Sequence, residues 1–217
     1  MTPAAVRDLI KSRRSVRGGF TDEPVSREDL LDLVEAGSWA PSTSNWQNVR
    51  FMIVTEPAEI ARIGAIRCVW PYRTTCPPGG VIGRAKALIV VFVDDEVAQW
   101  YRRHNGEIWR QLDPQNAAAA VQNILLLAFA KGLGACWISA LETMHRSDCL
   151  CGQTWADVWT SYDIPDSYEI FGIVMLGHRT DPAVGEKHHH GRAVQRRSPP
   201  YYIWTYDGKR MGARECD

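Results

Sequence analysis

The stretch NAAAAVQNILLLAFAKGLGACWI, residues 116–138, decides the fold of this 217-residue chain. Residues 116–131 are rich in Ala and Leu and apolar on nearly every side, which predicts a central, buried helix. We expect Gly132 and Gly134 to end this helix, because glycine readily adopts the conformation that closes a helix. Residues 135–138 then begin a strand, so the chain is predicted to turn from a buried helix straight into a sheet.

Three more apolar runs predict strands. Residues 87–93 are continuously apolar and β-prone, which is typical of a central strand buried on both faces. Residues 49–54 and 168–177 predict two further strands. Helices and strands mix without a regular βαβ alternation, so the sequence favours an α+β fold over a doubly wound parallel sheet.

The remaining helices are predicted from capping and periodicity. Residues 3–12 form a short amphipathic pattern. Ser26 is expected to cap a second helix, and Asp29 completes an approximate capping box. Gly37 is expected to interrupt or end that second helix. Other helices are predicted over residues 57–67 and 145–160.

The bulk composition predicts one globular domain over residues 1–217. Apolar residues make up 45% of the chain, which is long enough for one sizeable core. The 25 basic and 25 acidic side chains cancel, which argues against a nucleic-acid or membrane-surface partner. No apolar run is long enough to span a bilayer, and the N-terminus lacks a signal-peptide core. A cytoplasmic protein with free thiols is therefore expected.

Metal-ligand patterns are weak. The six cysteines are scattered, and none form a CxxC pair at zinc-ribbon spacing. Three adjacent histidines stand at residues 188–190, but neighbouring side chains point in different directions, which makes a single three-ligand site awkward. We interpret them as part of a polar loop and expect no metal.

Familiar catalytic motifs are also missing. The sequence holds no phosphate-binding lysine loop, no HExxH and no GxSxG. Residues 132–134, Gly-Leu-Gly, lack the third glycine of the dinucleotide fingerprint and follow a helix, not a strand. A cofactor, if present, must therefore be bound in another way, and we assign no side-chain nucleophile, acid or base.

Three segments could bind a ligand. Arg13, Arg14 and Arg17 stand close together with Ser15 between them, and guanidinium groups with a hydroxyl suit a phosphate; a solvated basic turn is the alternative. Asn45 and Gln47 carry amides that could pair with a flavin edge or with ribityl hydroxyls, or could simply cap a turn. Small residues over 132–138 would let backbone N–H groups approach a flat ligand, or would only cap the helix.

Together these segments resemble the nitroreductase family of FMN-dependent oxidoreductases, over residues 6–194. The resemblance implies a nitroreductase-like α+β fold: a central, mostly antiparallel sheet flanked by helices, in an intertwined homodimer with FMN at the interface. The matching pieces, in the family's order, are residues 12–17, residues 25–33, residues 40–42 with Asn45 and Gln47, residues 117–130 with Asn123, and residues 132–134 with Trp137 and Ile138.

The resemblance also implies roles for individual residues. One group would contact the phosphate and ribityl chain, a second would be laid against the flavin by the other subunit, and a third would line the ring, with a backbone N–H near its reactive nitrogen N5. The first group is Arg13 and Ser15, with Arg14 and Arg17 nearby. The second group is Pro41, Ser42, Thr43, Asn45 and Gln47. The third group is Trp137, Ile138, Ser139 and Ala140. Arg192 is the best match for a further phosphate contact, with His190 as an alternative.

The implied activity is ping-pong transfer of hydride from NAD(P)H through FMN to an electron-poor small molecule such as a nitroaromatic or a quinone. The sequence departs from the family in the pair Asn48-Val49, where Pro-Trp is usual, and in Gly18-Gly19. It also carries an aromatic-rich insertion around residues 94–114 and an extended tail over residues 195–217.

Alternatives stay open. The insertion favours an FMN-dependent oxidase or dehydrogenase that tailors a biosynthetic intermediate and passes electrons to oxygen. A flavin-binding module without activity, and a flavin-destroying or dehalogenating enzyme of the same superfamily, also fit the sequence. No ribose-reading residue distinguishes NADH from NADPH.

Overall fold

The computed structural model of the chain describes residues 2–67, 82–96, 99, 103, 112–139 and 160–181. The chain divides into two compact units, Met1–Val184 and Gly185–Asp217, and every described residue belongs to the first. The single-domain organisation over residues 1–217 stays a prediction. Several other predicted features lie outside the described residues: the helix over 145–160, most of the insertion around 94–114, the tail over 195–217, Ala140, Arg192 and the histidines at 188–190.

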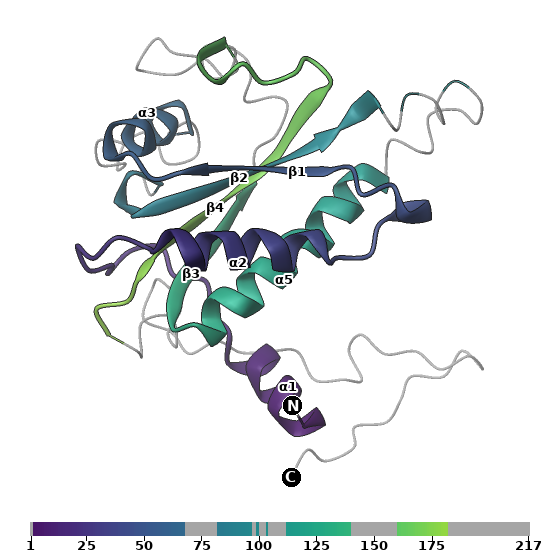
Figure 1. The fold of residues 1–217 in the computed structure, drawn as a ribbon. Helices are drawn as coiled ribbons and strands as arrows, with labels where there is room; N and C mark the ends of the chain where they lie inside the picture. Colours follow the sequence, from purple (N-terminus) through teal and green to yellow (C-terminus); the bar gives the residue numbers. More distant parts are fainter. Residues whose placement is uncertain are drawn as a thin grey trace, which may run out of the picture. The chain divides into compact units, whose positions relative to one another are not determined.

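A four-stranded sheet forms the centre of the described fold (Figure 1). Its strands lie in the order β1-β2-β4-β3, and each neighbouring pair is antiparallel. Every residue of β2 is buried, as the continuous apolar run predicts. The strands are β1 (Val49–Val54), β2 (Ala87–Asp94), β3 (Leu133–Ser139) and β4 (Tyr168–His178).

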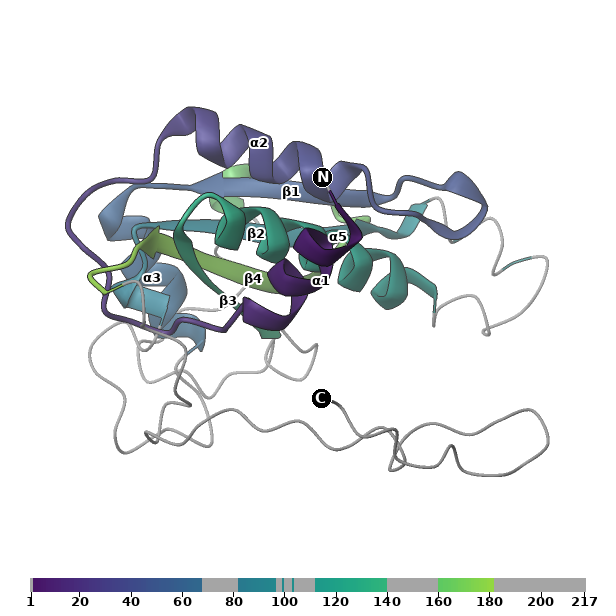
Figure 2. The same ribbon diagram turned by 90° about the horizontal axis from the view of Figure 1, so that it is seen from below.

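Helices cover both faces of the sheet, which confirms the α+β class. On one face, α2 (Arg27–Ser38) and α5 (Leu112–Ala130) pack against alternate residues of β2 and β4. On the other face, α3 (Pro57–Arg67) and the short helix η2 (Ile82–Arg84) pack against the intervening residues. Figures 1 and 2 show α3 on the opposite side of the sheet from α2.

The helix α5 is the central buried helix that its apolar sequence predicts. It begins four residues earlier than expected, at Leu112. Its first turn holds Asp113 and Pro114, an acidic residue that suits the positive end of the helix dipole and a proline that the first turn tolerates. Within the described residues, no helix is long and apolar enough to cross a membrane.

The two glycines after α5 have different roles. Gly132 adopts a φ of +79° in the turn, as expected for a glycine that closes a helix. Gly134, in contrast, lies inside β3, which begins at Leu133. A Cβ atom at Gly134 would lie 2.8 Å from Phe20 and 3.0 Å from Val16. The strand therefore needs glycine there because other parts of the chain pack against it, and the expected helix end is wrong for this position.

The helix α2 begins as predicted but does not end at Gly37. The Asp29 N–H donates to Ser26 Oγ over 3.0 Å, which is the expected N-terminal cap. The helix continues through Gly37 to Ser38. A Cβ atom at Gly37 would lie 2.9 Å from Phe51 and 3.1 Å from Ile124, so this glycine lets α2 pack closely against the core.

Candidate functional site

Residues 13–17, here called the basic segment, run along the outer edge of β3. The segment follows α1 (Pro3–Ser12), and β3 is an edge strand that pairs only with β4 inside the sheet. Val16 donates its backbone N–H to the Ala135 carbonyl over 2.9 Å, and Ser15 forms a parallel bridge with Ala135. Backbone pairing therefore joins two segments that the sequence analysis had singled out separately.

Three side chains of the basic segment influence the buried Cys136 in the middle of β3. Burial raises the pKa of the Cys136 thiol, while the Arg17 charge, a hydrogen bond with Ser15 and the Arg13 charge oppose that rise. Two guanidinium groups and a hydroxyl of the basic segment therefore act on the same residue of the strand. Arg17 is exposed, and no residue in the described part of the chain pairs with its guanidinium.

Arg14 lies differently from its two neighbours. Its Nη1 donates to the carbonyls of Lys11 and Arg13, so the side chain folds back over the end of α1. Its Nε is buried and has no hydrogen-bond partner among the described residues. Arg14 thus helps to close the helix from which the basic segment emerges, and its predicted cofactor contact stays a prediction.

The next residues of β3 present a backbone edge and an aromatic ring. Along a strand of an antiparallel pair, the backbone N–H and C=O groups of every second residue point to the same edge. Those of Trp137 therefore point to the outer edge of β3, as those of Ala135 do. The Trp137 indole lies over Gly172, where a Cβ atom would be 2.7 Å from its Nε1. It also packs at 5.3 Å, centroid to centroid, against Phe171, and stays 37% exposed. Ile138 packs with the core of the opposite face.

Residues 41–47, here called the amide segment, have an unusual backbone. Ser44, Asn45 and Gln47 adopt φ values of 48°, 57° and 50°, in the left-handed region that non-glycine residues avoid. Each such residue costs about 1 kcal/mol or more and persists only where the surroundings fix it. Three of them within one short stretch mean that the surrounding structure must hold this backbone in place.

Hydrogen bonds hold this conformation from inside the fold. The Thr43 backbone N–H donates to Asn116 Oδ1 over 2.9 Å, and the Thr43 hydroxyl reaches the same oxygen over 3.2 Å. The Gln47 N–H donates to Ser42 Oγ over 2.9 Å. The Gln47 carbonyl accepts from Arg50 Nη1 over 2.6 Å. The amide segment is therefore fixed at both of its ends.

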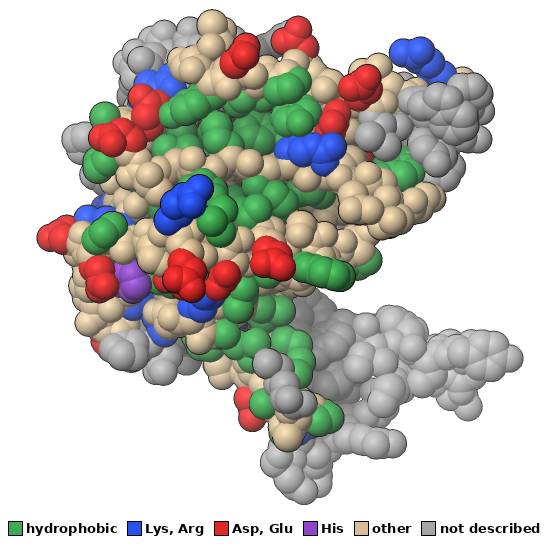
Figure 3. All heavy atoms as spheres, in the orientation of Figure 1, with side chains coloured by type: hydrophobic (Ala, Val, Ile, Leu, Met, Phe, Trp, Pro, Cys, Tyr) green, Lys and Arg blue, Asp and Glu red, His purple; other side chains and the backbone are tan. Residues whose placement is uncertain are grey.

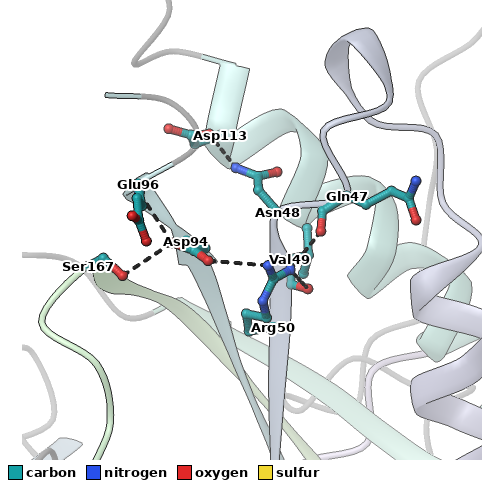
Figure 4. A network of polar contacts seen from close by, with 8 residues as sticks. All are labelled: Gln47, Asn48, Val49, Arg50, Asp94, Glu96, Asp113 and Ser167. Carbon is teal, nitrogen blue, oxygen red and sulfur yellow. Dashed lines mark hydrogen bonds and ion pairs between the residues drawn. The ribbon is translucent and has the colours of Figure 1, made fainter. Parts of the chain in front are cut away.

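The side chains of Asn45 and Gln47 point outward. Both are exposed, and neither amide group has a hydrogen-bond partner in the part of the chain that the structure describes. Figure 4 shows the Gln47 side chain directed away from the polar cluster behind it. Two amides that can donate and accept are thus presented at the surface by a fixed backbone.

A buried polar network behind the amide segment was missed by the sequence analysis. Asn48 is 0% exposed, and its Nδ2 donates to Asp113 Oδ1 over 2.6 Å. Its partners Asp113 and Asn116 are 3% and 4% exposed. The available signal was that Asp113 and Asn116 stand in the first turns of a helix whose later part is rich in Ala and Leu.

The basic segment and the amide segment are not brought together within this chain. No described contact joins them, and in Figure 1 the basic segment lies near α1 and β3 while the amide segment follows the far end of α2. The described residues also contain no group of three side chains suited to bind a metal.

Comparisons with known proteins agree on one family. Residues 10–70 and 72–178 match the model of the nitroreductase family. A Bacillus subtilis protein with the provisional name NAD(P)H nitroreductase YfhC is 30% identical over 186 residues, which cover 81% of this chain and 84% of the relative.

Solved structures show the same fold. A provisionally named nitroreductase of Desulfovibrio desulfuricans, crystallised with FMN, is 27% identical, has a TM-score of 0.64, and aligns over 94% of this chain and 96% of its own. An FMN-dependent nitroreductase of Clostridium difficile is 22% identical, with a TM-score of 0.61 over 87% of this chain and 91% of its own.

Proposed function

This chain belongs to the nitroreductase family, and on that basis we propose that it is an FMN-dependent oxidoreductase that uses NAD(P)H and acts as a homodimer. Bound FMN would supply the hydride chemistry, accepting hydride from NAD(P)H and passing it to an electron-poor acceptor such as a nitroaromatic or a quinone. The observation that carries the proposal is the Val16–Ala135 hydrogen bond, which aligns the basic segment with the edge of β3.

The chemistry of the donor set fits FMN. A phosphate monoester prefers guanidinium groups, which bind in a fork geometry, together with hydroxyl donors. Arg13, Arg17 and Ser15 supply both kinds of donor around Cys136. An exposed indole and an outward-facing backbone N–H follow at Trp137, and these suit the face and edge of a flat ring.

The proposed roles follow from these positions. Arg13 and Arg17 neutralise the phosphate, and Ser15 contacts the phosphate or ribityl chain. The Trp137 N–H donates toward the ring, with Ile138 and Ser139 continuing the same strand. Ala140 and Arg192, which lie outside the described residues, remain part of the proposal on the family resemblance alone.

The amide segment is assigned to the partner protomer's flavin. It lies apart from the basic segment of its own protomer, yet it turns the amides of Asn45 and Gln47 outward. A homodimer would bring the two regions together across an interface. Apolar side chains suited to such an interface are exposed. Val6 and Ile10 on α1 are 40% and 53% exposed, and Trp39 after α2 is 79% exposed. Figure 3 shows apolar side chains over α1.

An absorption spectrum of the purified protein, recorded before and after anaerobic NADPH and then NADH, tests the proposal. We expect oxidised-flavin bands that bleach with at least one nucleotide and return when a nitroaromatic or quinone is added. Flavin bands that resist both nucleotides would overturn the reductase assignment and favour the oxidase alternative. Absence of flavin, even after incubation with FMN, would overturn the cofactor assignment.

A further inference from the structure

Asn48, the residue before β1, connects β2 and α5 through its backbone and one buried side chain. Its carbonyl accepts the Asp94 N–H at the end of β2 over 2.8 Å. Its Nδ2 donates to Asp113 Oδ1 over 2.6 Å, and its Oδ1 accepts from Asn116 Nδ2 over 3.0 Å. Figure 4 shows Asn48 directed toward Asp113 at the start of α5. Both polar atoms of the amide are thus used, in one orientation only.

The next link leads to the amide segment. Asn116 gives its Nδ2 to Asn48 and turns its Oδ1 to the N–H and hydroxyl of Thr43. The hydrogen bonds therefore run in a fixed order from Asp113 through Asn48 and Asn116 to Thr43. Because each amide has distinct donor and acceptor ends, neither can rotate without losing a partner in a buried site.

This chain of bonds ends where the backbone is least relaxed. Ser44, Asn45 and Gln47 have positive φ, and a stretch of this kind keeps its shape only if its surroundings over-determine it. Thr43 is where the buried network meets that stretch. The network thus has the position and the directionality needed to select the left-handed conformation of the amide segment.

We propose that Asn48 and Asn116 are positioning residues, which hold the amide segment in the conformation that binds FMN before the cofactor arrives. The inference rests on the proposed function and deepens it: these residues touch neither the flavin nor the substrate, and they act through Thr43. Since apparent affinity scales with the fraction of protein in the competent conformation, a tenfold fall in that fraction raises the FMN Kd about tenfold.

The test compares two asparagines of the same helix. Asn116→Ala removes the contacts to Asn48 and Thr43. Asn123→Ala, about two turns further along α5, removes one bond to the Ala36 carbonyl and leaves the network intact. Each variant is measured for hydrogen exchange of residues 41–48 in the flavin-free protein, for FMN Kd by fluorescence titration, and for the melting temperature of the flavin-free protein.

The proposal predicts that Asn116→Ala exchanges faster over residues 41–48 and binds FMN about tenfold more weakly, with Asn123→Ala matching the wild type in both. Asn48→Ala, a second variant, is expected to behave like Asn116→Ala. Wild-type exchange and FMN affinity in Asn116→Ala would overturn the proposal while leaving the FMN assignment intact. Equal losses in Asn116→Ala and Asn123→Ala, in proportion to melting temperature, would overturn it as well. A wild-type protein that binds no FMN would instead overturn the proposed function itself.

Discussion

Val16 donates its backbone N–H to the carbonyl of Ala135 over 2.9 Å, across 119 positions of sequence and at the outer edge of the sheet. This bond holds a short, strongly basic turn against an edge strand, and the charges of Arg13 and Arg17 act on Cys136 of that strand. The groups proposed to bind the phosphate and the flavin ring are thereby brought into one region by main-chain pairing, which is insensitive to the identity of most side chains.

The first prediction concerns Arg13. Arg13→Ala is expected to weaken FMN binding about tenfold or more, because a hydrogen bond to a charged partner contributes roughly 1.5–3 kcal/mol. Flavin content after purification and an FMN titration measure the effect. Arg7→Ala, which removes an exposed arginine of α1, is the matched control and should bind FMN normally. Wild-type flavin content in Arg13→Ala would remove Arg13 from the site.

A second prediction separates the side chain of Asn45 from its backbone. Asn45 has φ of 57°, so Asn45→Gly keeps the backbone relaxed and deletes only the amide, whereas Asn45→Ala also adds left-handed strain. If the amide contacts flavin, both variants should lose flavin occupancy while sedimentation shows an unchanged oligomeric state. Full occupancy in Asn45→Gly with a loss in Asn45→Ala would assign the effect to backbone strain and reject the contact.

The third prediction tests the packing beneath Trp137. In Gly172→Ala the new Cβ would lie 2.7 Å from the Trp137 Nε1 and 3.0 Å from the Ile138 carbonyl oxygen. Such overpacking costs about 1–3 kcal/mol, which should lower the melting temperature of the flavin-free protein by several degrees. Gly18→Ala meets only ordinary contacts, at 3.5 Å from Arg84, and should melt like the wild type. Equal melting temperatures for the two variants would show that Trp137 does not need Gly172.

A fourth prediction concerns the tie between α2 and α5. Lys131 Nζ lies 2.7 Å from Asp29 Oδ1 and 2.6 Å from Asp32 Oδ2, and the bond to Lys131 is the largest cause that lowers the pKa of Asp29. Lys131→Met should therefore melt below the wild type at low salt, and the gap should shrink in 1 M NaCl because the three groups are partly exposed. Lys11→Met, on the exposed surface of α1, serves as the control.

The pH dependence of that gap has a definite sign. A carboxyl group whose pKa is lowered by folding adds stability above its unfolded value, near pH 4, and loses it as the pH falls through the folded value. Differential scanning calorimetry should thus find the gap between wild type and Lys131→Met constant from about pH 5 to 8 and closing below about pH 4. A gap that persists at pH 2 would contradict the ion-pair explanation.

The sequence predicted the elements of the core well, because their apolar patterns are local. The strand β1 and the helix α3 have the predicted bounds, Val49–Val54 and Pro57–Arg67. The predictions of element ends were wrong where a residue is required by packing against a part of the chain that is distant in sequence. Gly37 and Gly134 look like helix terminators locally, but each is required by side chains that other elements bring against it.

The same reasoning explains what was found and missed at the site. Arg13, Ser15 and Arg17 could be singled out because guanidinium and hydroxyl groups stand together in the sequence. Asn48 was noted only as part of a departure from the family, and its buried role could not be predicted, because its acceptor Asp113 and its donor Asn116 are 65 and 68 positions away and meet it only in the fold. An asparagine after a turn is otherwise indistinguishable from an ordinary turn residue.

The most direct test of the central claim, that the basic segment at the edge of β3 binds the FMN phosphate, is a paired titration with FMN and riboflavin. The wild-type protein is predicted to bind FMN about 100-fold or more tightly than riboflavin, and Arg13→Ala to lose about tenfold of that preference with riboflavin affinity unchanged. Equal affinity of the wild type for the two flavins, or a preference that Arg13→Ala leaves intact, would contradict the account.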